Sequence, residues 1–255
     1  MNFIISANTD IGIVKDTNQD GLSVKIINTP QGRMAFAVLC DGMGGLSKGE
    51  VASTTLVSAF NEWVYNGLPA LCSTGITDSA IRSQWEDIVV KQNKIIGSYG
   101  ASQGIRLGTT VVVMLITQSR YYIMNIGDSR AYEIFDTVHQ LTEDQTFVAR
   151  EIKLGKMTPE EAKTDSRRNV LLQCIGASDA IYPDMFFGDT KKDAVYMLCS
   201  DGFRHEITSD EMYEKFRPGI LTDAAVMDFN SRQLIELNKQ RSERDNISVA
   251  LIKTF

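Results

Sequence analysis

The feature that most restricts the fold of this chain is a set of short, almost wholly apolar segments rich in β-branched and aromatic residues. The clearest lie at positions 34–40, 109–117, 121–126, 194–199 and 247–252. Such runs are typical of β-strands. Because several of them hardly alternate between apolar and polar residues, both faces of these strands are expected to be covered. The strands must therefore lie between other layers of the protein.

Helical periodicity separates these strands. Residues at the three- and four-residue spacing of a buried stripe predict helices around 51–63 and 81–99, and a third helix is predicted from Asp223 towards Gln240. The residues expected to face inward are Val51, Thr55, Ala59 and Trp63 in the first, Ile81, Trp85, Ile88, Gln92, Ile95 and Tyr99 in the second, and Val226, Phe229, Leu234 and Leu237 in the third.

The order of these segments indicates the fold class. The strands come in runs that helices separate, which favours an α+β fold with sheet packed on sheet over a doubly wound parallel sheet. No internal repeat, low-complexity tract or Pro/Ser-rich linker is present, so one domain over residues 1–255 is the simplest interpretation. The segment 158–161, Thr-Pro-Glu-Glu, has the pattern of a capping box and predicts the start of a short helix.

Composition narrows the classes of function. The net charge of −6, with no basic block to offset it, argues against a nucleic-acid partner. The four cysteines, Cys40, Cys72, Cys174 and Cys199, form no C-x-x-C pair, and Cys40 and Cys199 lie in apolar runs typical of buried thiols. The first residues do not resemble a signal peptide, and no apolar run reaches the ~20 residues of a membrane helix. We therefore expect a soluble cytoplasmic protein with no membrane partner.

Four aspartates stand directly beside the ends of predicted strands. Asp41, Asp128 and Asp201 follow a strand and Asp245 precedes one, while Asp20 lies near the first strand. Taken singly, an Asp before a Gly is a common hairpin turn, and this interpretation stays open for each such residue. As a set, the carboxylates could converge on one rim of a sheet, where they would repel one another and raise their pKa values. Hard divalent cations, which prefer oxygen ligands, would remove that repulsion.

The other residue types support oxygen ligands over zinc ligands. Only two histidines are present, His139 and His205, and no thiol pair lies near them, which argues against zinc. Gly42, Gly44 and Gly45 would let the backbone approach a ligand closely, so a carbonyl such as that of Gly42 could itself coordinate a metal ion. The segment lacks the G-x-x-x-x-G-K-[ST] pattern of a nucleotide-binding P-loop.

Taken in order, these motifs resemble those of the metal-dependent protein phosphatases of type 2C, and the Met within the Gly-rich motif resembles their bacterial branch. The resemblance extends from Thr9 to Ile252. The matching segments are Asp10-Ile11-Gly12, Asn18-Gln19-Asp20, Asp41-Gly42-Met43-Gly44-Gly45, Gly108-Thr109-Thr110, Gly127-Asp128-Ser129-Arg130, Ser200-Asp201-Gly202 and Asp245-Asn246-Ile247-Ser248-Val249.

The resemblance implies a fold and an activity. The fold would be two antiparallel β-sheets packed face to face and flanked by helices, a four-layer α/β/β/α sandwich, with a flap subdomain at about 142–177. The activity would be that of a serine/threonine phosphoprotein phosphatase with two Mn²⁺ or Mg²⁺ ions in its core site. A hydroxide bridging the two ions would attack the phosphomonoester, and no protein nucleophile would be needed.

The resemblance also implies roles for particular residues. Asp41 would bridge the two ions, with the Gly42 carbonyl on one of them, and Asp201 and Asp245 would complete the shell of the other. Catalysis would therefore depend on Asp41, Asp201 and Asp245. Asp20 would support the ion on the Gly42 side, through water.

Two further roles lie outside this core. Asp128, with Asp201, would hold a weaker third ion. Lys15 stands where many relatives have an Arg that binds the substrate phosphate; Lys keeps the charge without the bidentate fork, and a solvated surface lysine is the alternative. His205 follows the Asp201 motif closely enough to lie at the edge of the site, although a surface-loop histidine is the favoured interpretation. Relatives usually have His-Pro where this chain has 165–166, Asp-Ser, which leaves the conformation of the flap open.

The implied partners are phosphorylated proteins, namely the substrates of a Ser/Thr kinase, and the chain is expected to be a monomer. Two other classes of function stay open. One is a pseudophosphatase that docks phosphorylated partners without turnover. The other is a domain that Ca²⁺ stabilises and that catalyses no reaction. This hypothesis is weaker, because the acidic residues are scattered along the chain and no D-x-[DN]-x-[DN]-G loop is present.

Overall fold

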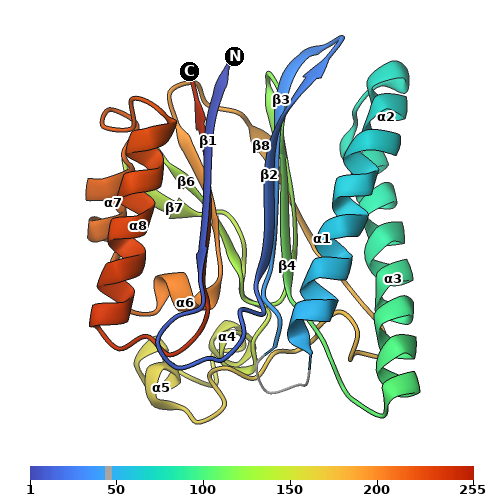
Figure 1. The fold of residues 1–255 in the computed structure, drawn as a ribbon, viewed down its shortest axis with the longest axis vertical. Helices are drawn as coiled ribbons and strands as arrows, with labels where there is room; N and C mark the ends of the chain where they lie inside the picture. Colours follow the sequence, from blue (N-terminus) through green and yellow to red (C-terminus); the bar gives the residue numbers. More distant parts are fainter. Residues whose placement is uncertain (44–47) are drawn as a thin grey trace.

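Two five-stranded antiparallel sheets lie face to face in this protein, with helices outside both of them (Figure 1). The structure is a computed structural model that describes residues 1–43 and 48–255. One sheet has the strand order β1-β10-β9-β6-β7 and the other β2-β3-β4-β5-β8. The α+β class and the four-layer arrangement predicted from the sequence are confirmed.

The strands are short and their bounds follow the apolar runs closely. The first sheet contains β1 (Phe3–Asp10), β10 (Ile247–Thr254), β9 (Val195–Cys199), β6 (Arg130–Ile134) and β7 (Val138–Gln140). The second contains β2 (Gly21–Thr29), β3 (Gly32–Cys40), β4 (Val111–Ile116), β5 (Arg120–Ile126) and β8 (Asp184–Asp189).

Helices cover the outer face of each sheet, and two short helices lie beneath both (Figure 1). The second sheet is covered by α1 (Gly49–Asn66), α2 (Leu68–Thr74) and α3 (Asp78–Gln103), and the first by α6 (Asp201–Arg204), α7 (Ser209–Phe216) and α8 (Ala224–Gln240). The pair beneath is α4 (Phe147–Lys153) and α5 (Pro159–Thr164). None of the described helices has the length and apolar character that a membrane crossing requires.

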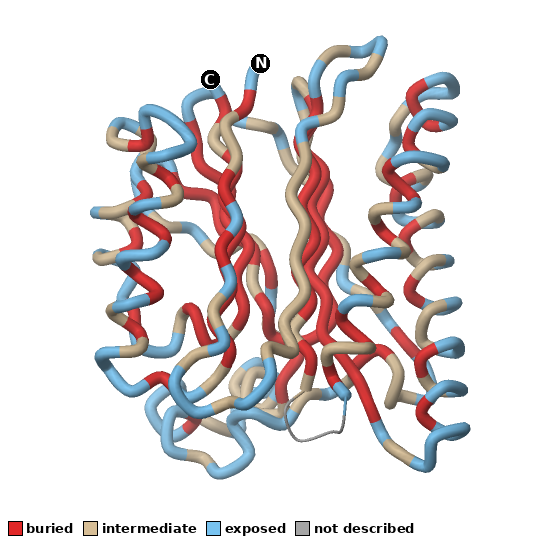
Figure 2. Tube along the Cα trace, in the orientation of Figure 1, coloured by how far each residue is buried: buried red, intermediate tan, exposed pale blue. Residues whose placement is uncertain are grey.

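The apolar core forms three layers, one between the sheets and one beneath each helical face (Figure 2). Strand β3 shows why a strand in this position is apolar at every residue from Met34 to Cys40. Phe36 and Val38 belong to the core layer beneath α1 and α3, whereas Ala37 and Leu39 belong to the layer between the sheets. Because successive side chains of a strand point to opposite faces, a strand between two layers must be apolar at every position.

The expected helical stripes are only partly correct. Trp63 and Trp85 are buried and lie edge to face with ring centroids 5.5 Å apart. In the second half of α3, however, Ile95 and Tyr99 are exposed. The buried stripe instead continues through Val89, Ile96 and Gly100. A stripe drifts around a helix of this length, so spacing alone does not fix its later members.

Other local predictions have clear outcomes. Phe229, expected to face inward on α8, is 60% exposed. The capping box at Thr158 is confirmed, because its hydroxyl accepts a hydrogen bond from the Glu161 N–H and the Glu161 carboxylate accepts one from the Thr158 N–H. An unpredicted second box starts α7 at Thr208. All four cysteines are buried and free of disulfides.

Candidate metal centre

Strand register brings the aspartates together at one end of the two sheets. Gly21, at the start of β2, pairs with Cys40, at the end of β3, so Asp20 and Asp41 are neighbours. In the facing sheet Val249 of β10 pairs with Cys199, the last residue of β9, which places Asp245 and Asp201 at the same end. The clustering predicted from the positions of the aspartates at strand ends is therefore what the register produces.

The backbone of Asp41 is fixed by the Thr pair that precedes β4. The Asp41 N–H donates to the Thr110 hydroxyl over 3.0 Å, and the Asp41 carbonyl accepts from the Thr110 N–H over 2.9 Å. The Thr109 hydroxyl donates to the same carbonyl over 2.9 Å. These bonds use only main-chain atoms of Asp41, so its carboxylate stays available for a ligand.

Close packing explains two of the glycines beside the aspartates. Gly42 lies against the carbonyls of Gln19 and Gly49, and Gly202 lies against the carbonyl of Asn246. A Cβ atom at either position would overlap those backbone atoms, so only glycine allows the segments that carry Asp20, Asp41 and Asp201 to come this close. Gly44 and Gly45, also expected to allow close approach, lie outside the described residues.

Asn246 ties the loop before β2 to the start of β10. Its side-chain amide donates to the carbonyls of Ile11 and Thr17, over 2.9 and 3.2 Å, and its side-chain oxygen accepts from the Gln19 N–H over 2.9 Å. The loop between these anchors carries Lys15. Sequence reasoning noted Asn246 only as part of a motif and missed this role.

Lys15 lies within the aspartate cluster. Its Nζ is 2.8 Å from Asp245 Oδ1, in a pair that is only partly exposed. Burial lowers the pKa of Lys15, but its hydrogen bond to the Asp245 carboxylate and the charges of Asp245, Asp41 and Asp201 outweigh that effect, so the pKa is raised overall. Lys15 is therefore a fixed cation beside the carboxylates.

The buried carboxylates favour metal binding electrostatically. Both carboxylate oxygens of Asp20 and Oδ1 of Asp201 are buried, with no hydrogen-bond partner among the described residues. Burial, and then the charges of Asp201 and Asp245, raise the pKa of Asp20 to about 7, against the opposing effect of nearby hydroxyls. Burial and the neighbouring aspartates also raise the pKa of Asp41 well above its usual value. Buried oxygens without partners and mutual repulsion are what a divalent cation would relieve, so this donor set fits Mg²⁺ or Mn²⁺.

The carboxylates are close without forming a complete cage. Within residues 1–43 and 48–255, no three Asp, Glu, His or Cys side chains converge tightly enough to hold an ion by themselves. Ions bound here would therefore need carbonyl and water oxygens as well, as expected for Mg²⁺, which keeps several of its waters in proteins.

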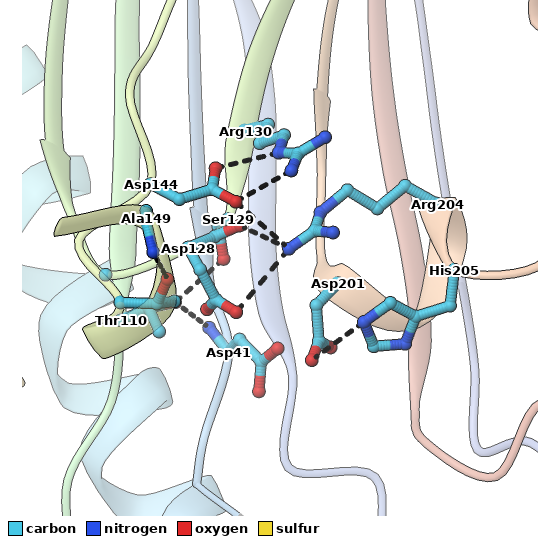
Figure 3. A network of polar contacts seen from close by, with 12 residues as sticks. Asp41, Thr110, Asp128, Ser129, Arg130, Asp144, Ala149, Asp201, Arg204 and His205 are labelled. Carbon is cyan, nitrogen blue, oxygen red and sulfur yellow. Dashed lines mark hydrogen bonds and ion pairs between the residues drawn. The ribbon is translucent and has the colours of Figure 1, made fainter. Parts of the chain in front are cut away.

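Asp128 belongs to a second group of charges beside this cluster (Figure 3). Arg204 Nη2 lies 3.2 Å from the Asp128 carbonyl, 3.5 Å from Asp128 Oδ2 and 3.7 Å from Asp144 Oδ2. Arg130 holds Asp144 through two hydrogen bonds of 2.7 Å. Burial and the charge of Asp201 raise the pKa of Asp128 to about 7, although Arg204 opposes that shift.

His205 lies in the bend directly after α6 and is exposed as a residue, and its side chain contacts the edge of the site. Its side chain is 31% exposed, with Nε2 3.6 Å from Asp201 Oδ2 and Nδ1 3.3 Å from Glu243 Oε2. The other oxygen of Glu243, Oε1, accepts hydrogen bonds from the backbone N–H groups of Arg244 and Asp245, over 2.7 and 2.8 Å. Glu243 thus links Asp201, through His205, to the backbone of Asp245.

A helical signal could have located Arg204, which sequence reasoning missed, and the contact that His205 makes. Arg204 and His205 follow Asp201 by three and four positions, the spacing at which helical side chains meet. A helix starting at Asp201 therefore places both next to its carboxylate. Glu243 and Asp144 are far from Asp201 in the sequence, and no local pattern marks them.

Comparison with known proteins identifies the family. The family model described as protein phosphatase 2C matches residues 13–225. A 2C-type protein phosphatase of Streptococcus pyogenes serotype M6 is 30% identical over 251 residues, which cover 97% of this chain and 96% of that protein. The structure of the S. agalactiae serine/threonine phosphatase matches with a TM-score of 0.82 and 27% identity over the whole of both chains.

A second solved structure bears on the metal. It is the catalytic domain of the serine/threonine protein phosphatase PstP in complex with two manganese ions, and it matches with a TM-score of 0.75 and 25% identity over 99% of each chain. The chain described here belongs to the protein phosphatase 2C family. It is a metal-dependent protein serine/threonine phosphatase, whose substrates are phosphoproteins, as the sequence motifs predicted.

Proposed function

We propose that the aspartate cluster holds two Mn²⁺ or Mg²⁺ ions and is the site at which this chain hydrolyses phosphoserine and phosphothreonine in proteins. The observation that carries the proposal is the group of buried carboxylate oxygens without partners on Asp20 and Asp201, beside Asp41. A cluster of this kind is costly to the fold unless cations bind it.

The residues divide by position into two groups of ligands. Asp41, directly after β3, would bridge the two ions. Asp201 and Asp245 would hold one ion from the first sheet. Asp20 and the Gly42 carbonyl would hold the other, because the Gly42 N–H donates to the Gln19 carbonyl over 3.2 Å and keeps these segments together.

The chain's own groups would bind and orient the phosphoryl group. When bound, divalent ions lower the pKa of coordinated water and neutralise charge on the phosphoryl oxygens. Lys15 uses one of its three donors on Asp245, which leaves two for a substrate oxygen. Asp245 thereby holds the Lys15 ammonium beside the proposed ligands, and Asn246 fixes the loop that carries it.

The proposal also covers the domain organisation, the substrates, the cellular location and the oligomeric state. Residues 1–255 would act as one phosphatase domain, and the segment at about 142–177, which contains α4 and α5 beneath the sheets, would be its flap (Figure 1). The substrates would be proteins phosphorylated by a Ser/Thr kinase, and the protein would work in the cytoplasm as a monomer.

Turnover measured against metal concentration tests the proposal. Wild-type protein is expected to hydrolyse p-nitrophenyl phosphate and a phosphothreonine peptide in the presence of Mn²⁺ and to stop when EDTA is added. Asp41→Asn and Asp201→Asn should lose the activity, whereas Asp87→Asn, on the exposed face of α3, should retain it. Peptide binding without turnover across the Mn²⁺ range would instead indicate a binding module.

A further inference from the structure

Arg204 occupies the position next to Asp128 where a third cation would otherwise be expected. Its side chain is only 13% exposed and follows Asp201 by one helical turn. Among the described residues, Arg204 is the one basic side chain within ion-pair distance of Asp128. The carboxylate that would serve a third ion therefore already has a positively charged neighbour.

The surroundings keep the guanidinium of Arg204 in place. Its Nη2 is shared between the Asp128 carbonyl and the carboxylates of Asp128 and Asp144 (Figure 3). Asp144 is itself fixed by the two bonds from Arg130, and Ser129 is hydrogen-bonded to the Thr110 hydroxyl over 2.8 Å. Arg204 thus lies between segments that β5, β6 and the residues after β7 hold rigidly.

Charge and geometry oppose a further ion here. A guanidinium keeps its charge at all accessible pH values. A divalent cation on Asp128 would meet that charge within a few ångströms, in a buried region where repulsion is weakly screened. To bind, the ion would have to displace Arg204 from Asp128 and leave a buried Arg without one of its acceptors.

From this geometry we infer that Arg204 is a built-in replacement for a third metal ion, so this phosphatase holds two ions and no third. The inference rests on the proposed two-ion centre and adds that the number of bound ions does not exceed two. It also changes the role expected for Asp128, which becomes the partner of Arg204 and not a metal ligand.

Counting bound ions tests the inference without reference to turnover. Equilibrium dialysis against Mn²⁺ up to millimolar concentration, with metal measured by mass spectrometry and free Mn²⁺ by electron paramagnetic resonance, should give two ions per wild-type chain. Arg204→Met should gain a third, because the charge is removed while the aliphatic part of the side chain is replaced by one of similar length. Arg204→Lys, which keeps the charge, should stay at two. In the neutral variant the third ion should bind at least about ten-fold more tightly than in wild type.

A double substitution and a single one complete the design. Arg204→Met combined with Asp128→Asn should return the count to two, and Asp128→Asn alone should leave the wild-type count unchanged. The result for Asp128→Asn alone does not depend on how well Arg204→Met folds. Melting curves in EDTA would check the folding of the two variants that contain Arg204→Met. Three ions in wild type, or the loss of one ion in Asp128→Asn alone, would overturn the inference. No bound ion in any variant would instead overturn the two-ion centre itself.

Discussion

Replacing Asp20 with Asn is expected to stabilise the metal-free protein at alkaline pH, although Asp20 belongs to the proposed metal centre. Residue 20 is partly exposed as a whole, but both of its carboxylate oxygens are buried without partners. Its pKa is raised from 3.8 to about 7, chiefly by burial and then by the charges of Asp201 and Asp245. A shift of about three pKa units corresponds to roughly 4 kcal/mol, of which about 2 kcal/mol should remain after relaxation and after burial of the new amide.

The sign follows from proton binding. Between pH 3.8 and about 7 the folded state keeps a proton on Asp20 that the unfolded state has lost. The free energy of unfolding of the wild type must therefore fall as the pH rises through this window and level off above it. The Asn variant lacks this term, so the two proteins should differ little near pH 4 and most at pH 8.

Urea unfolding in EDTA, followed by the fluorescence of the two tryptophans, measures the difference. Asp87→Asn, an exposed substitution on α3, is the matched control and should behave as wild type at both pH values. Excess Mn²⁺ should reverse the ranking at pH 8, because an ion that binds only the folded state stabilises it. An Asp20→Asn variant that is equal to or less stable than wild type in EDTA at pH 8 would refute the electrostatic reasoning.

Three other substitutions separate positioning of the ligands from stability of the fold. Glu243→Gln should weaken Mn²⁺ binding about ten-fold in calorimetric titrations, because Glu243 links His205 to the Asp245 backbone; an unchanged dissociation constant would contradict that role. Arg241→Met removes the pair to Glu211, 2.6 Å long and partly exposed, and should lower the midpoint of urea unfolding only slightly while leaving metal affinity unchanged. Phe203→Ala should cost about 3–5 kcal/mol in the same melts, since the ring is buried in the core; a loss below ~1 kcal/mol would contradict this.

The strands that could be predicted from the sequence and those that could not differ in how many neighbouring strands and core layers they contact. β3 and β4 lie inside the second sheet with core layers on both sides, so β3 from Met34 onwards and the whole of β4 are apolar at every position and easy to recognise. Four of the missed strands, β1, β2, β7 and β8, are the edges of the two sheets, and the fifth, β6, lies inside the first sheet but has Arg130 and Glu133 among its five residues. An edge strand has one neighbour and more exposed positions, and β2 accordingly carries half-buried residues throughout much of its length. Its composition therefore resembles that of a loop.

In the site, too, the features set by neighbouring residues in the sequence could be predicted, whereas contacts between distant residues could not. The aspartates were recognisable because each adjoins a strand end, and antiparallel register brings those ends together. The partners that hold them depend on pairs distant in the sequence, such as Arg204 with Asp128 and Glu243 with His205. Only the packing of α6 against the sheet end creates these pairs, so spacing along the chain could not predict them.

The two cations beside the aspartates are held in different ways, and this difference suits phosphate chemistry. Lys15 is paired with Asp245 in a partly exposed position, with donors left for a substrate, whereas the Arg204 side chain is only 13% exposed and lies against Asp128. Five aspartates, these two side chains and two divalent ions leave a net charge of about +1, which attracts a phosphate dianion without trapping the product. A third ion would raise that charge by two and favour retention of phosphate. With Arg204 in that place, the site keeps a positive charge that does not depend on the metal supply.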